Sequence, residues 1–378
     1  MLQERLKALR AEMEKRGITV YVVPTADFHE SEYVGDHFKA RKFITGFTGS
    51  AGTAVITLDE AGLWTDGRYF VQAENQLKDS TVTLYRMGEE GVPTVDEFVK
   101  DRLKEGGCLG FDGRVVNGTW GGKLEKIAAE KNVSMHVTED LIDLIWEDRP
   151  ALSKQPLFIL EEKYSGKSTA DKIADLRKAM KENGADVHIL TSLYDIAWLL
   201  NIRGNDIDYV PVVLSYLVLN ETECIWFLQE EVVDDKIRAY LEENHITTKP
   251  YDAIYDYVPE IPADAVVLMN RGTVNYRIVN SLDKAIKVVD KPNPTELMKA
   301  VKNKTEVDNT RAAHVKDGVA FTKFMYWLKT NIGKIPMTEI SASDYLEARR
   351  REQDNFIELS FNTICALSLI HISEPTRH

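Results

Sequence analysis

The residues best placed to do chemistry lie in one stretch, residues 41–73, which joins a glycine-rich loop to an arginine. Its glycines at positions 46, 49 and 52 let the backbone pass close to another group. The apolar, β-branched run at residues 53–58 predicts a buried strand, and residues 63–65 return as a second strand that delivers Arg68 at its end, where binding sites tend to lie. Arg68 is therefore a candidate ligand contact, and a solvated turn residue after Asp-Gly is the alternative that the residues leave open.

Other familiar catalytic patterns are missing from the sequence. The glycine-rich loop lacks the Lys-Ser/Thr pair of a phosphate-binding loop, which argues against nucleotide binding. His314 has no second histidine four positions on, as a zinc-protease helix requires, and no Gly-x-Ser-x-Gly elbow occurs. The cysteines Cys108, Cys224 and Cys365 have no placed histidine partner. The residues alone give no complete catalytic set, so no catalytic residue is assigned.

A second group of polar residues could be drawn as a metal site. Its possible ligands fall between positions 27 and 37: Asp27, His29, Glu30, Glu32, Asp36 and His37. Metal ligands need fixed geometry and further side chains that orient them, whereas this run follows the end of a predicted strand. We therefore expect a polar, solvated loop here rather than a metal centre.

The elements that position these residues recur along the chain. A helix is predicted at residues 2–16 and a strand at residues 18–23. The same pattern returns past residue 150 at a constant offset of 167 positions, and residues 212–219 and 223–228 repeat the strand pair of the opening stretch. The sequence thus predicts two copies of one α/β domain.

Domain boundaries follow from proline-bearing linkers. We expect domain I at residues 1–150, domain II at residues 151–291 and the start of a third domain at residues 292–366. The third segment predicts a long helix at residues 306–329, a helix that begins with the capping pair Ser341 and Asp344, and a strand from residues 356–364.

The end of the chain, residues 367–378, has a different character. Its string LSLIHISEPTR is similar to the in-frame translation of a transposase-type sequencing adapter, so we exclude it from fold reasoning. Its histidines, His371 and His378, are not counted as ligands.

Composition narrows the classes of partner. The chain carries 60 acidic against 47 basic residues, a net charge of −13, which disfavours nucleic acid and anionic membranes. The longest uncharged apolar run, residues 210–219, is too short to span a bilayer. With no apolar signal core after Met1 and only three cysteines, a cytoplasmic location is expected.

Several strings carry a resemblance to a known family. They are HESEY at residues 29–33, ITGFTGSAGTAVIT at 44–57, LWTDGRYFVQA at 63–73, IWEDRP at 145–150, DIAWLLNIRGNDI at 195–207, PVVLSYLVL at 211–219 and TEISASDYLEARRRE at 338–352. Over residues 1–366 the chain resembles the three-domain cytosolic Xaa-Pro aminopeptidases (aminopeptidase P) of the creatinase/prolidase superfamily. The resemblance implies two tandem creatinase-like α/β domains followed by an incomplete pita-bread catalytic domain.

The same resemblance implies a function and a partner. Members of the family use two divalent metal ions, commonly manganese, to cleave the bond before a penultimate proline, because paired metals activate water and stabilise the oxyanion. The arginine of the family's WTDGRY string contacts substrate and corresponds to Arg68. The expected partner is a peptide with proline in second position, and the intact family member is expected to be a homodimer.

The resemblance also implies what this chain lacks. The family's metal ligands are two aspartates, a histidine and two glutamates downstream of the string SFNTI, which the chain reaches at residues 360–364. We therefore expect an inactive N-terminal fragment that binds no metal, with no metal ligand assigned. The alternatives are a noncatalytic peptide-binding module of creatinase-like domains and a relative of prolidase or creatinase.

Overall fold

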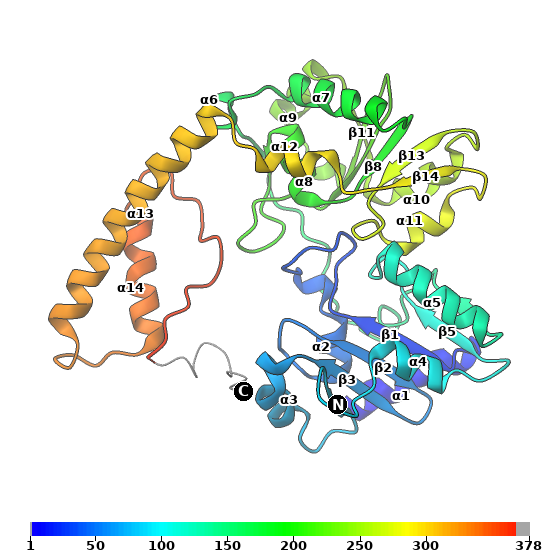
Figure 1. Cartoon of the computed structure of the whole chain (residues 1–378). Helices are drawn as coiled ribbons and strands as arrows, with labels where there is room; N and C mark the ends of the chain where they lie inside the picture. The colour runs from blue at the N-terminus through cyan, green and yellow to red at the C-terminus, as the bar shows by residue number, and fades with distance from the viewer. Residues whose placement is uncertain (1, 368–378) are drawn as a thin grey trace.

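The computed structural model describes residues 2–367 and contains two α/β units, with a pair of long helices to one side of them (Figure 1). The first unit is built on a six-stranded sheet with the order β4-β3-β2-β1-β5-β6. Its strands are β1 (Val20–Pro24), β2 (Thr53–Thr57), β3 (Ala61–Thr65), β4 (Thr83–Arg86), β5 (Cys108–Phe111) and β6 (Ser134–His136). The sheet is mixed, because β1 pairs with β2 antiparallel and with β5 parallel.

Helices cover both faces of this sheet. Tyr21 and Val23 of β1 pack with one set of helices, and Val20 and Val22 pack with the other, as the two-residue period of a strand requires. The first face is covered by α1 (Leu2–Lys15), α2 (Ala40–Thr45) and α3 (Phe70–Leu77), and the second by α4 (Val95–Arg102) and α5 (Gly118–Glu130). A strand buried on both faces is continuously apolar, and such apolar runs allowed these strands to be predicted from the sequence.

The second unit repeats the first. Its sheet has the order β12-β11-β10-β8-β13-β14, the same succession of equivalent strands. They are β8 (Val187–Leu190), β10 (Ser215–Leu219), β11 (Cys224–Leu228), β12 (Ile246–Pro250), β13 (Val266–Met269) and β14 (Lys287–Asp290), with α7 (Thr169–Glu182), α8 (Leu193–Leu200), α9 (Asp235–Glu243), α10 (Ile254–Tyr257) and α11 (Tyr276–Ser281) around them. The predicted duplication of one α/β domain is confirmed.

The two copies join through equivalent segments. The amide of Gly118 donates to the carbonyl of Val274 at 2.8 Å, and the amide of Tyr276 donates to the carbonyl of Val116 at 2.7 Å. These residues occupy corresponding positions at the starts of α5 and α11. A second reciprocal pair of bonds joins Thr119 to Arg271 and Arg277 to Gly113. The copies therefore pack about an approximate two-fold axis, in the manner of an isologous dimer.

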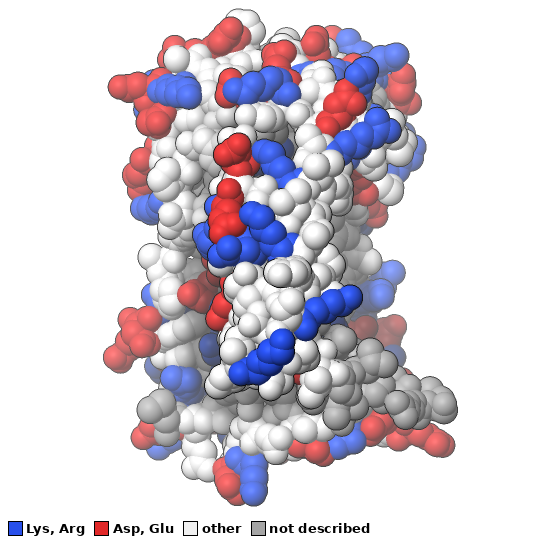
Figure 2. Space-filling view, turned by 90° about the vertical axis from the view of Figure 1, so that its left-hand side faces the viewer, with Lys and Arg blue, Asp and Glu red and all other residues white. Residues whose placement is uncertain are grey.

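The third segment begins with α12 (Pro294–Ala300) and continues into α13 (Lys304–Asn331) and α14 (Glu339–Arg351), which lie side by side away from the first unit (Figure 1). A small core centred on Phe324 and Leu346 holds the last two helices together. Figure 2, viewed from their side, shows uncharged surface between separate charged side chains. None of the helices in residues 2–367 combines the length and apolar character needed to cross a membrane.

Two predictions for this segment need correction. The helix α14 is capped by Thr338, whose side chain accepts from the amide of Ser341, so it begins earlier than the predicted Ser341 cap. The predicted strand at residues 356–364 is wrong: this segment is irregular, and Ile357 and Phe361 in it are exposed. A strand needs a neighbour to satisfy its backbone, and no other strand in residues 2–367 pairs with it.

The other predictions about the domains are not tested by the fold. The boundaries at residues 150 and 291, and the identity of residues 292–366 as the start of a pita-bread domain, stay predictions. The adapter-like tail, including His371 and His378, falls outside the described residues apart from Leu367.

Candidate functional site

The glycine-rich loop is held from beneath by a buried arginine. Arg41 is only 3% exposed, and its guanidinium donates from Nε to Thr25 Oγ1 at 2.9 Å, from Nη1 to the carbonyl of Phe47 at 2.6 Å and from Nη2 to the carbonyl of Gly49. All three acceptors are neutral oxygens, and burial lowers the pKa of Arg41 to about 10. The loop therefore lies over a fixed positive charge.

Side chains of α3 and the turn before it hold the loop from the other side. The amide of Thr48 donates to Gln76 Oε1 at 2.8 Å, and its hydroxyl accepts from Gln72 and Gln76. The hydroxyl of Ser50 bonds to that of Tyr69 at 2.5 Å. At the end of the loop a Cβ on Gly52 would lie 2.8 Å from the carbonyl oxygen of Trp64, which accounts for a glycine at that close approach.

Arg68 lies in the short 3₁₀ turn η2 (Gly67–Tyr69) that follows β3. Its guanidinium donates to both carboxylate oxygens of Asp66, at 2.8 and 2.9 Å, and this bond lowers the pKa of Asp66. The Arg68 side chain is still 60% exposed. Its Cζ lies 5.2 Å from the ring centre of Tyr69, whose hydroxyl contacts Ser50. The structure thus brings Arg68 and the glycine-rich loop together, while its contact with a ligand stays a prediction.

The polar run at residues 27–37 is solvated only in part: Glu32 and Asp36 are exposed, as expected, whereas Asp27 and His29 are not. Asp27 and His29 are 1% and 2% exposed because the end of β1 meets the second copy. The Asp27 carboxylate accepts from the amides of His29 and Ser31, both at 2.9 Å. His29 Nδ1 donates to the carbonyl of Thr191 at 3.0 Å, and Nε2 accepts from the hydroxyl of Tyr251 at 2.6 Å. Burial lowers the pKa of His29 to about 4, so the ring is neutral at pH 7. Its two hydrogen bonds connect the first copy to the second.

These residues do not form a metal centre. Within residues 2–367 no group of three His, Cys, Asp or Glu side chains is arranged to hold a metal ion. The side chains in this part of the chain therefore do not fit the paired ions that the family resemblance implies.

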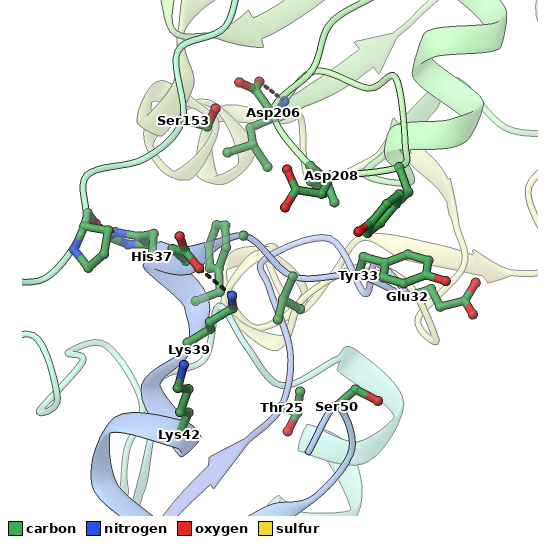
Figure 3. Close-up of a pocket in the computed structure, with 18 of the residues that line it drawn as sticks. Thr25, Glu32, Tyr33, His37, Lys39, Lys42, Ser50, Ser153, Asp206 and Asp208 are labelled. Carbon is green, nitrogen blue, oxygen red and sulfur yellow. Dashed lines mark hydrogen bonds and ion pairs between the residues drawn. The ribbon is translucent and has the colours of Figure 1, made fainter. Parts of the chain in front are cut away.

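A cavity of about 520 Å³ opens between the two copies (Figure 3). Residues 32–42 and 48–50 of the first copy form one wall, residues 205–209 of the second copy form the opposite wall, and residues 150–155 close one side. Lys42 and Asp208 direct opposite charges into this space from the two walls. Sequence analysis missed both, because no motif links two residues so far apart and only the packing of the copies makes them neighbours.

Comparison with known proteins identifies the two units. Two models described as the creatinase/prolidase N-terminal domain match residues 5–145 and 148–306. These residues therefore belong to the creatinase/prolidase N-terminal domain family, as the sequence motifs predicted.

The similarity extends to proteins with a particular name. The probable Xaa-Pro aminopeptidases P of Sordaria macrospora and Neurospora crassa are each 39% identical over 376 residues, with 96% of this chain covered and 61% and 55% of the relatives. The crystal structure of the Caenorhabditis elegans X-prolyl aminopeptidase has a TM-score of 0.90 and 32% identity, with 96% of this chain and 62% of that chain covered. The chain is homologous to the Xaa-Pro aminopeptidases P and spans less than two thirds of the length of these relatives.

Proposed function

We propose that this chain is an N-terminal fragment of a metal-dependent aminopeptidase that removes the first residue from peptides with proline in second position. It would supply the two N-terminal domains and the start of the third. The observation that carries the proposal is similarity to Xaa-Pro aminopeptidases P across 96% of the chain in sequence and fold. The Caenorhabditis elegans relative is described as a cytosolic enzyme with a di-nuclear active site, which supports a cytoplasmic location for this protein as well.

Arg68 is the proposed substrate-binding residue. Its side chain is exposed at a strand end, is oriented by Asp66 and stands beside a loop that several side chains hold in place. A guanidinium presents parallel N–H donors that suit peptide carbonyl or carboxylate oxygens. We expect it to position a peptide for a reaction that other residues carry out.

The reaction itself requires metal-ion chemistry, for which residues 2–367 contain no suitable group of three ligands. Two divalent ions, commonly manganese in the family, would activate the water that attacks the bond before proline. We propose that residues outside this chain hold them, that the chain by itself is inactive, and that the complete assembly is a homodimer.

Two experiments test the proposal. Equilibrium dialysis of the purified chain against manganese is expected to show no stoichiometric tight uptake, and an assay with Xaa-Pro peptides no release of the first residue. The second experiment replaces the matching part of the Caenorhabditis elegans enzyme by residues 2–303 of this chain. This chimera is expected to cleave Xaa-Pro peptides.

Substitutions in the chimera also compare the role of Arg68 with that of Glu231, the equivalent residue of the second copy. Arg68→Gln should lower kcat/KM about 10- to 100-fold, the effect of losing a charged hydrogen bond to substrate. Glu231→Gln, at the equivalent turn, should leave kcat/KM unchanged. Equal effects of the two changes would refute the role of Arg68. If the chimera is folded but inactive and the chain by itself binds peptides, these two results would favour the noncatalytic peptide-binding module.

A further inference from the structure

We propose that the cavity between the two copies binds a short peptide with both termini free, its carboxylate at Lys42 and its ammonium group at Asp208. This ligand class follows from the charges, volume and lining of the cavity. It involves no covalent step and does not rest on the proposed metal-dependent cleavage.

The first wall of the cavity has three basic side chains, Lys39, Lys42 and buried Arg41, against two acidic ones, Glu32 and Asp36. Lys39 is paired with Asp36, whereas Lys42 has no ion-pair partner of its own in the described part of the chain. The pKa of Asp36 is lowered by its bond to Lys39 and, to a smaller extent, by the charge of Lys42. Buried Arg41 adds a cation behind this wall. Figure 3 shows the ammonium group of Lys42 directed into the cavity.

The opposite wall carries only negative charge. Asp206 accepts from the amides of Leu214 at 2.9 Å and Gln155 at 3.1 Å, so its carboxylate serves the local fold. Asp208 forms no ion pair with any residue in positions 2–367, and Figure 3 shows its carboxylate facing the cavity. Glu32, an exposed acid on the first wall, directs its carboxylate away from Lys42 (Figure 3). Across the gap, therefore, the cation of Lys42 faces the anion of Asp208, which suits a ligand with opposite charges at its two ends.

Aromatic, apolar and uncharged polar groups together line the cavity around these charges. Tyr33 and Tyr209 bring their ring centres to 5.9 Å, and Phe38, Val34 and Leu214 add apolar surface. Polar side chains such as Ser50 and Asn205 also line it, and its volume lies within the range of about 300–1,000 Å³ that is typical of small-molecule sites. A dipeptide or tripeptide with an apolar middle matches both the charges and the lining.

Both charged residues stand on supported backbone. Lys42 belongs to α2, beside Arg41 and its three hydrogen bonds. Asp208 lies in a tight turn closed by the bond from the amide of Val210 to the carbonyl of Ile207 at 3.2 Å. Within that turn Tyr209 has a φ of 68°, in the left-handed region that non-glycine residues rarely adopt. Strain of this kind concentrates at binding sites, where the surroundings must hold it.

Calorimetric titration of the whole chain with Ala-Pro-Ala tests the proposal, in low-salt buffer at pH 7 with a chelator that prevents metal-dependent hydrolysis. The free tripeptide is expected to bind, and N-acetylation or C-terminal amidation should each weaken binding about three- to fivefold, since each removes one charge pair. Lys42→Gln should weaken binding of the free peptide by the same factor and leave the amidated peptide unaffected. Asp208→Asn should do so for the free peptide and not for the acetylated one.

Matched controls are available on the surface of the chain. Lys126→Gln on α5 and Asp264→Asn before β13 remove charges away from the cavity and should leave all affinities unchanged. Circular dichroism checks that each variant is folded. Absence of binding at millimolar peptide, equal affinity for free and blocked peptides, or equal effects of cavity and control variants would each overturn the proposal.

Discussion

The two copies share a backbone and differ in chemistry at the same point. Each has a short 3₁₀ turn directly after its third sheet strand, Gly67–Tyr69 in the first and η3 (Glu230–Val232) in the second. The first turn presents Arg68, whereas the equivalent residue of the second is Glu231, which pairs with Lys154 at 2.8 Å. The two copies thus share a fold but carry side chains of opposite charge, Arg68 and Glu231, at the equivalent turn. A shared fold therefore does not imply a shared function for the two turns.

A second difference lies in how each copy uses a buried cation. Arg41 of the first copy supports the glycine-rich loop, which lines the cavity. In the second copy Lys172, 1% exposed, donates to the carbonyl of Trp198 at 2.8 Å and to Asn201 Oδ1 at 2.6 Å, at the end of α8. The buried cation of the first copy therefore stabilises a loop, whereas that of the second copy satisfies acceptor oxygens at the end of a helix.

The largest expected effect tests where the second copy ends. Lys299 of α12 pairs with Asp195 of α8 at 2.6 Å, and Asp195 is 1% exposed. Lys299→Ala should cost about 3 kcal/mol in the free energy of unfolding, because it leaves a buried carboxylate without its cation. The estimate is at the low end because Lys299 itself is 31% exposed. Urea denaturation measures it, with exposed Lys302→Ala as control; equal losses would place α12 outside the cooperative unit of the second copy.

The next prediction concerns the contact between the copies. A Cβ on Gly121 of α5 would lie 2.1 Å from Cδ2 of Tyr276, whereas a Cβ on the adjacent Gly122 would meet no atom within 4 Å. Gly121→Ala should therefore destabilise the chain by about 1–3 kcal/mol through overpacking. Gly122→Ala should stabilise it by about 0.5–1 kcal/mol through helix propensity. Chemical denaturation of both variants gives the comparison, and stabilisation by both would contradict the observed packing.

A smaller effect depends on pH. Burial lowers the pKa of Lys172 to about 8, below the value near 10.5 in an unfolded chain. Between these values the unfolded chain holds a proton that the folded chain has released, so the free energy of unfolding rises with pH. The cost of burying the charged ammonium group of Lys172 is therefore largest below pH 8. The difference between wild type and Lys172→Met should shift in favour of the wild type by on the order of 1 kcal/mol from pH 7.5 to 9.5. A pH-independent difference in urea titrations would refute it.

The smallest expected effect returns to the two turns. Arg68→Gln and Glu231→Gln each break an exposed ion pair, and such pairs contribute about 0–1 kcal/mol. Thermal unfolding should therefore detect little change in either variant. A large loss of stability on Arg68→Gln alone would mean that the arginine serves the fold, and any loss of activity could no longer be read as loss of substrate contact.

The sequence by itself determined the duplicated architecture. The strands are buried on both faces and so are continuously apolar, and the helix positions return at a fixed offset, both of which are local properties. The position of Arg68 after a strand followed from the same pattern. The strand expected at residues 356–364 failed for the opposite reason, because pairing depends on a neighbouring strand and cannot be read from the segment that would pair.

Only the tertiary structure decided where polar residues lie. Asp27 and His29 have the composition of a surface loop, yet the second copy covers them, so their partners come from residues far along the chain. Lys42 and Asp208 face one cavity for the same reason. Burial and opposition of charge depend on how the two copies pack about their approximate two-fold axis, and no spacing within either copy encodes that arrangement.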